Sequence, residues 1–112
     1  MRTSTRRAAV FAALLCSLHA GGAVAASPAG KTHTVIMEGV AFAPATLAVR
    51  AGDTVTWVNK DAFPHTATAQ DRSFDSGEIP AARSWKMAAR KAGSFAYVCT
   101  LHPGMKGTLV VK

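Results

Sequence analysis

Short apolar stretches separated by turn-forming residues dominate the chain from residue 34 onwards. In residues 54–59, Val55 and Trp57 fall on one face, because successive side chains of a strand point to opposite sides. The stretches that read in this way are 34–38, 46–50, 54–59, 83–88, 95–99 and 107–112. Gly, Pro and Asp mark the turns between many of them. Strands at this spacing predict an all-β domain, built as a β-sandwich or barrel.

One segment, residues 81–91, has a composition that also suits a helix. Its two large apolar side chains, Trp85 and Met87, are two residues apart, however. A spacing of two places both on one face of a strand, whereas a helix would separate them. We therefore predict a strand here as well.

The N-terminus has the pattern of an export signal. Arg2, Arg6 and Arg7 precede an apolar run over residues 10–18, and small residues follow through Ala26. The run is shorter than the roughly 20 residues that span a bilayer, so no membrane span is expected. The sequence predicts a leader at 1–26, cleaved near residues 25–26, a single domain at 27–112 and a periplasmic location.

Removing this leader changes the charge and the cysteine count. It takes three of the thirteen Lys and Arg residues and none of the six Asp and Glu, so the formal charge falls from +7 to +4. The remaining basic residues do not cluster, which argues against nucleic-acid binding. Of the two cysteines, Cys16 is lost and Cys99 remains without an internal disulfide partner. The thiol of Cys99 therefore needs another explanation.

The stretch Cys99-Thr-Leu-His-Pro-Gly-Met105 places a thiol, an imidazole and a thioether within seven residues. These soft donors favour copper among the first-row metals, and two His with one Cys and a weak axial Met form the electron-transfer copper arrangement. That arrangement needs a second His besides His102. The candidates are His33 and His65, and we favour His65 because it follows the strand 54–59 as the motif follows the strand 95–99.

Other sites that use cysteine fit the donor count less well. Structural zinc usually takes four strong Cys or His ligands, and Met is a poor zinc donor. Covalently attached haem needs Cys-x-x-Cys-His, which is absent from the chain. A cysteine nucleophile activated by His102 lacks a recognisable orienting group.

Residues 34–112 resemble a cupredoxin of the plastocyanin and amicyanin branch, with the short ligand loop of amicyanin. The motifs that carry this resemblance are Phe42-Ala-Pro44, residues 51–59, Pro64-His65, Phe74-Asp-Ser-Gly77, residues 93–99 and Cys99-x-x-His-Pro-x-Met105. The resemblance implies a Greek-key β-sandwich or barrel of about seven to eight strands. It also implies one type-1 copper held by His65, Cys99, His102 and Met105. Asn59 is implied to hydrogen-bond the backbone next to the Cys ligand and so to tie the two ligand segments together.

The function implied by this resemblance is one-electron transfer between periplasmic redox proteins, not enzymatic catalysis. The electron is expected to pass through His102, surrounded by an apolar docking surface of Phe63, Pro64, Pro103 and Gly104. The basic charge suits an acidic donor or acceptor protein, and we expect a monomer. An alternative function is copper delivery or storage, because such proteins use the same donors.

Overall fold

The computed structural model describes residues 30–112, so the predicted leader lies outside the described residues. Every regular element in this range is a β-strand, which confirms the predicted all-β class. The strands are β1 (Thr32–Met37), β2 (Phe42–Ala43), β3 (Thr46–Val49), β4 (Thr54–Asn59), β5 (Thr68–Ala69), β6 (Ser84–Ala88), β7 (Gly93–Cys99) and β8 (His102–Val111). The segment with helix-like composition forms β6, as its period-two pattern predicts.

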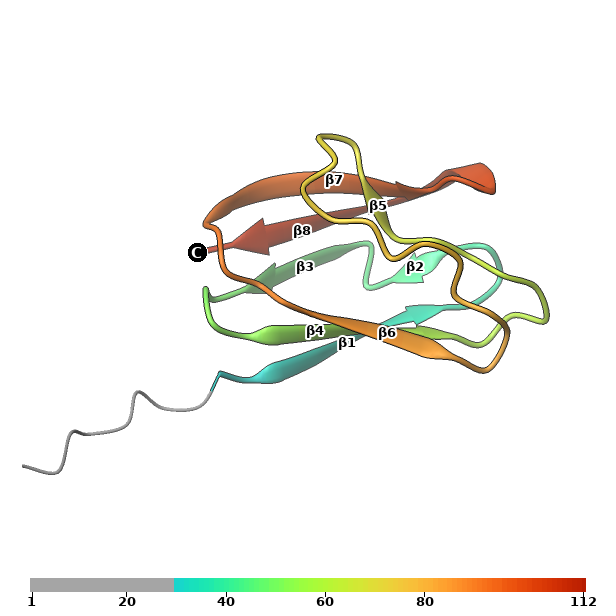
Figure 1. Ribbon diagram of the computed structural model, residues 1–112, viewed down its shortest axis with the longest axis horizontal. Helices are drawn as coiled ribbons and strands as arrows, with labels where there is room; N and C mark the ends of the chain where they lie inside the picture. The colour runs from blue at the N-terminus through green and yellow to red at the C-terminus, as the bar shows by residue number, and fades with distance from the viewer. Residues whose placement is uncertain (1–29) are drawn as a thin grey trace, which may run out of the picture.

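The eight strands form two four-stranded sheets that lie as two layers (Figure 1). One sheet has the order β2-β1-β4-β6 and the other has the order β3-β8-β7-β5. In each sheet one pair is parallel: β1 with β4, and β3 with β8. Both parallel pairs join strands that are not consecutive in the chain, so each sheet depends on contacts between distant parts of the sequence.

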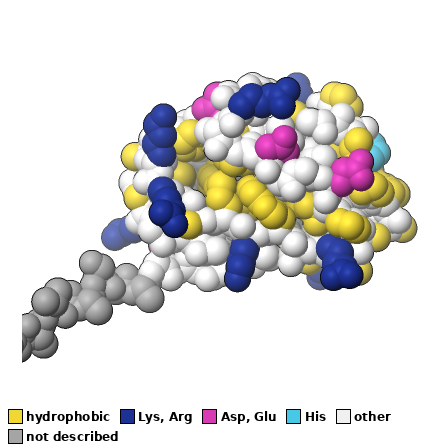
Figure 2. Space-filling view, viewed as in Figure 1, with side chains coloured by type: hydrophobic (Ala, Val, Ile, Leu, Met, Phe, Trp, Pro, Cys, Tyr) yellow, Lys and Arg dark blue, Asp and Glu magenta, His cyan; other side chains and the backbone are white. Residues whose placement is uncertain are grey.

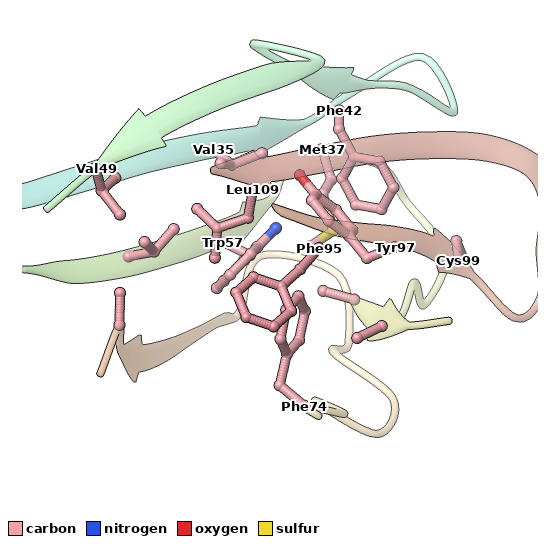
Figure 3. Close-up of a cluster of buried hydrophobic side chains, with 14 of the residues drawn as sticks. Val35, Met37, Phe42, Val49, Trp57, Phe74, Phe95, Tyr97, Cys99 and Leu109 are labelled. Atoms are coloured by element: carbon pink, nitrogen blue, oxygen red, sulfur yellow. The ribbon is translucent and has the colours of Figure 1, made fainter. Parts of the chain in front are cut away.

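Aromatic side chains fill the space between the sheets (Figure 3). Trp57 of β4 is fully buried, and its ring packs edge-on against Tyr97 of β7 with the ring centroids 5.7 Å apart. Phe42 of β2 packs on the other side of Tyr97 at 4.7 Å. In β4 the side chains alternate between buried and half-buried positions, as the sequence pattern predicts. The sheets are thus held together mainly by buried apolar area.

Two details differ from the sequence prediction. The predicted strands 95–99 and 107–112 leave residues 100–106 between them as a loop, but β8 already begins at His102 and only Thr100 and Leu101 form the turn. The strands β2 and β5 were not predicted because each has two residues, too few to show a period. The ligand motif therefore lies in a tight β-hairpin, which restrains it more than a loop would.

Gly107 offers a test of the packing between β7 and β8. It lies opposite Tyr97, and a Cβ built on Gly107 would be 2.4 Å from Cζ and 2.5 Å from the hydroxyl of that ring. Gly107→Ala must therefore displace a fully buried ring, and we expect a loss of about 1–3 kcal/mol of unfolding free energy, as for other overpacked cores. Urea unfolding followed by fluorescence measures this loss. The matched control is Gly104→Ala in the same strand, where a Cβ meets nothing within 4 Å; equal losses in the two variants would contradict the packing argument.

Candidate metal centre

The β7–β8 hairpin positions three of the predicted ligands. Cys99 ends β7, His102 begins β8, and the two residues are paired across the two-residue turn. The Cys99 side chain is fully buried, whereas His102 is half-buried. Met105 follows in β8 with 2% of its surface exposed, and belongs to the same cluster. The local hairpin thus brings a buried thiol, a half-buried imidazole and a buried thioether together.

His65 reaches this group from a different segment, the connection between β4 of one sheet and β5 of the other. It follows β4 in a loop at the same end of the molecule as the β7–β8 turn (Figure 1). Two backbone hydrogen bonds with Ile79 fix its position, and its side chain is fully buried. Its Nδ1 lies 3.6 Å from the Sγ of Cys99, and Nδ1 of His102 lies 3.8 Å from the same sulfur. The ligand atoms of these three residues are all within 4.8 Å of one another, a spacing at which one ion can contact all three.

Asp61 orients the ring of His65. Its Oδ2 lies 2.7 Å from Nε2 of His65, and its two carboxylate oxygens accept hydrogen bonds from the amides of Gly39 and Val40. The Val40 amide, followed by the hydrogen bond with His65, lowers the pKa of Asp61. An ionised carboxylate only accepts hydrogen bonds, so Nε2 of His65 carries the proton and Nδ1 presents its lone pair to the cluster.

Sequence reasoning did not identify Asp61. An Asp-x-x-x-His spacing is visible in the chain, but spacing in an irregular loop does not reveal which residues touch. Listing the Asp and Glu residues within four positions of each candidate His would have included Asp61 as one possible partner of His65.

Asn59 does not make the contact that the resemblance implied. It is fully buried, but its side-chain amide donates to the carbonyls of Phe63 and Ile79, and its Oδ1 accepts from the amide of Asp61. Asn59 therefore shapes the loop that carries His65 instead of joining that loop to the segment beyond Cys99. Its side chain is committed to partners between residues 59 and 79.

Thr66 makes the link between the two ligand segments. Its amide donates to the Sγ of Cys99 at 3.3 Å, and its Oγ1 accepts a hydrogen bond from the amide of Thr100 at 2.9 Å. Thr66 directly follows His65, and Thr100 directly follows Cys99. An amide that donates a hydrogen bond to sulfur stabilises the negative charge of a sulfur that binds a metal. Sequence reasoning missed Thr66, whose contacts with Thr100 extend the register of the β5–β7 pairing, in which Thr68 lies opposite Val98. The strand β5 is too short to be predicted, so this pairing was not visible in the sequence.

His33, the other candidate ligand, lies in β1 away from the cluster. Its Nε2 is 2.9 Å from Oδ2 of Asp53, which also accepts from the amides of Lys31 and Arg50. The amide of Arg50 contributes most, followed by His33, and these hydrogen bonds lower the pKa of Asp53 to about 2. Within residues 30–112, the group that could hold a metal consists of His65, Cys99 and His102 and excludes His33. The arrangement agrees with the preference for His65.

The donor set fits copper. One thiol and two imidazoles surround a common point, a buried thioether lies in the adjoining strand, and Thr66 supplies a hydrogen bond suited to a thiolate. Within the described residues, Cys99 is a free cysteine and forms no disulfide bond. Two His, one Cys and one Met at the end of a two-layer β-sandwich define the class of type-1 copper proteins.

Comparison with known proteins gives the family. Residues 6–111 match the family described as Cupredoxin-like domain. Amicyanin-alpha of Methylorubrum extorquens is 30% identical over 119 aligned residues, which cover 95% of this chain and 99% of the relative. Plastocyanin of Scenedesmus fuscus is 33% identical over 63% of this chain and 86% of its own length. The chain belongs to the cupredoxin-like family, within its amicyanin and plastocyanin branch, as its motifs indicated.

Solved structures give the same result for the fold. A structure of a mutant amicyanin in the Cu(I) form superposes with a TM-score of 0.67 at 28% identity, covering 72% of this chain and 82% of that one. A copper-containing nitrite reductase from Thermus scotoductus superposes with a TM-score of 0.68 at 30% identity. The chain spans 22% of the length of that reductase, so this likeness concerns a part of a larger protein.

The surface around His102 is apolar. Phe63 is 41% exposed and Leu101 is 43% exposed, although both are large hydrophobic side chains. The Phe63 ring packs at 5.2 Å from His65 and 5.4 Å from His102, measured between centroids. Figure 2 shows apolar side chains and a histidine at the end of the molecule where Figure 1 places the β7–β8 turn. We call this surface the His102 patch; it consists of Phe63, Pro64, Leu101, Pro103 and Gly104 around His102.

The described residues contain no helix that is long and apolar enough to cross a membrane.

Proposed function

We propose that this protein is a periplasmic electron carrier that holds one copper ion through His65, Cys99, His102 and Met105. The single observation that carries the proposal is the half-buried His102 residue, which joins the buried donors to the apolar His102 patch. Bound copper supplies a couple that exchanges one electron between Cu(I) and Cu(II). The leader predicted at residues 1–26 supports a location in the periplasm.

The residues around the centre suit this task because they are held in place. Cys99 and His102 belong to paired strands, His65 is fixed by Ile79 and Asp61, and Thr66 joins the two ligand segments. Donors restrained in this way move little when the charge of a bound ion changes, so the reorganisation that accompanies electron transfer is small. A protein that must release its metal gains nothing from such restraint, which favours transfer of electrons over delivery or storage of copper.

The His102 patch suits a transient redox partner. Exposed apolar area of this kind marks an interaction site, and it brings a partner close to the His102 ring. Ten Lys and Arg residues against six Asp and Glu remain after the proposed cleavage, so the protein is cationic overall. We expect this charge to favour an acidic donor or acceptor and to make association weaken with added salt.

Pro103→Glu tests the proposed route. Two molecules exchanging electrons through their His102 patches would have to bury two carboxylates close together, so we expect self-exchange to slow at least tenfold, equivalent to about 1.4 kcal/mol. NMR line broadening in mixtures of the reduced and oxidised protein measures the rate. The optical spectrum should be retained, because no proposed ligand is changed.

The matched control is Ala51→Glu, which adds the same charge in the β3–β4 turn next to Lys112, at the opposite end of the sandwich. Equal rates in the two variants would exclude the His102 patch as the route. Slow exchange in the unmodified protein, together with ready transfer of Cu(I) to a metal-free acceptor, would favour copper delivery.

A further inference from the structure

A row of hydroxyl groups leads from the metal centre to an exposed carboxylate. Thr66 Oγ1 lies 3.2 Å from the hydroxyl of Thr100 and 3.0 Å from the hydroxyl of Thr68. The hydroxyl of Thr68 lies 3.0 Å from Oδ1 of Asp75, which belongs to the loop between β5 and β6. Thr66 and Thr68 are buried, each with 3% of its surface exposed, so water has little access to these two hydroxyls.

Asp75 sets the direction of every hydrogen bond in the row. The Gly77 amide and the Thr68 hydroxyl lower the pKa of Asp75, so its carboxylate is ionised at neutral pH and accepts only. Thr68 must then donate to Asp75, and its single proton is used there. Because Thr68 has no second proton, Thr66 donates to Thr68, which leaves the lone pairs of Thr66 Oγ1 to accept.

The acceptor created in this way lies next to the metal ligands. Thr66 Oγ1 accepts from the amide of Thr100 at 2.9 Å and from its hydroxyl, so both polar groups of the residue after Cys99 point to one oxygen. The amide of the same Thr66 donates to the sulfur of Cys99. The position of this amide therefore depends on a chain of bonds that ends at Asp75.

We propose that Asp75 is a positioning residue for the metal centre, acting through Thr68 and Thr66 on the hydrogen bond to the Cys99 sulfur. The inference rests on the proposed copper site and adds to it a residue from a third segment of the chain. The carboxylate touches none of the four donors, so it acts by fixing the orientation of hydroxyl groups.

The variants Asp75→Asn and Asp75→Ala separate this role from an effect of charge. Both remove the negative charge, but the asparagine Oδ1 can still accept from Thr68 and from the Gly77 amide. Alanine offers no acceptor, so the hydroxyl of Thr68 can donate to Thr66 instead. The hydrogen bonds of the row then no longer have one fixed order of donors and acceptors. An effect of charge is equal in the two variants, whereas an effect of orientation appears in alanine alone.

Two measurements decide between these outcomes. In metal-free protein, hydrogen exchange of the Thr100 amide should be at least tenfold faster in Asp75→Ala than in Asp75→Asn. In copper-loaded protein, the reduction potential of Asp75→Ala should be below that of Asp75→Asn, because a weaker hydrogen bond leaves the thiolate a stronger donor to Cu(II). Asp71→Ala is the matched control, since it removes an exposed carboxylate of the same loop that bonds Ser73 instead.

The variant Thr68→Val provides a second test, because valine keeps the shape of threonine without the hydroxyl. It should behave as Asp75→Ala does in both measurements. Equal behaviour of Asp75→Ala and Asp75→Asn in either measurement would overturn the inference. A wild-type protein that fails to turn blue with Cu(II) would contradict the proposed function instead, and the amide exchange of the metal-free variants would still decide whether Asp75 orders the row.

Discussion

Cys99→Ser should abolish the blue colour of the copper-loaded protein completely. The wild-type protein should turn intensely blue with Cu(II), because a thiolate transfers charge to copper when it is bound at one corner of a trigonal His₂Cys site. A serine hydroxyl stays protonated at neutral pH and is a harder donor, so no such transition is possible. Titration with Cu(II), followed by visible absorption, measures the result.

The control for this prediction is His33→Ala. His33 pairs with Asp53 outside the cluster, so its removal should leave the colour and the stoichiometry of one copper per chain unchanged. Loss of colour in His33→Ala, with His65→Ala still blue, would show that His33 and not His65 binds the copper. A wild-type protein that binds Cu(II) without colour would exclude a type-1 centre.

Trp57→Ala should lower the free energy of unfolding by about 3–5 kcal/mol, the usual cost of truncating a fully buried aromatic side chain. Trp57 contacts both sheets: its ring lies 5.3 Å from Trp85 of β6 and 5.7 Å from Tyr97 of β7, between centroids. A cavity at this point cannot close without moving one sheet against the other. Such a loss is a large part of the 5–15 kcal/mol that holds a typical domain folded.

The control is Trp85→Ala, which removes the same side chain from a half-buried site directly across the strand pair. Its loss should be clearly smaller, because part of this ring is exposed in the folded protein. Trp57→Phe should cost less than Trp57→Ala, since it keeps most of the ring and removes a buried Nε1 that has no hydrogen-bond partner among the described residues. Urea unfolding of the metal-free variants gives all three values, and equal losses at Trp57 and Trp85 would contradict the assigned core.

Local patterns explain why much of this protein could be predicted from its sequence. Alternation identified the longer strands, including β4 around Trp57, because one face of each strand is buried. Cys99 and His102 were recognised together because they are close in the sequence. The fold keeps them close, since they pair across the β7–β8 turn. His65 was predicted as a ligand because it comes directly after a strand, as the Cys99 motif does. The fold places the ends of these two strands close together.

Contacts between segments could not be predicted in the same way. Asn59, Asp61 and Thr66 are all polar residues near His65, and the sequence does not show which of them reaches the other ligand segment. Asn59 was preferred, but its amide is used by the carbonyls of Phe63 and Ile79, which leaves the link to Thr66. The roles of such residues depend on donor and acceptor geometry that appears only when the distant segments have come together in the fold.

The two-residue turn of the β7–β8 hairpin also affects how strongly copper stabilises the folded chain. Because Cys99, His102 and Met105 lie within seven residues, an unfolded chain keeps these donors close together and retains affinity for Cu(I). A ligand stabilises the native state only by the difference between its affinities for the folded and unfolded states. That difference depends on His65, the donor that comes from the β4–β5 connection, more than thirty residues before Cys99. The increase in melting temperature on metal loading should therefore be smaller than the total binding affinity suggests, and should depend mainly on whether His65 is present.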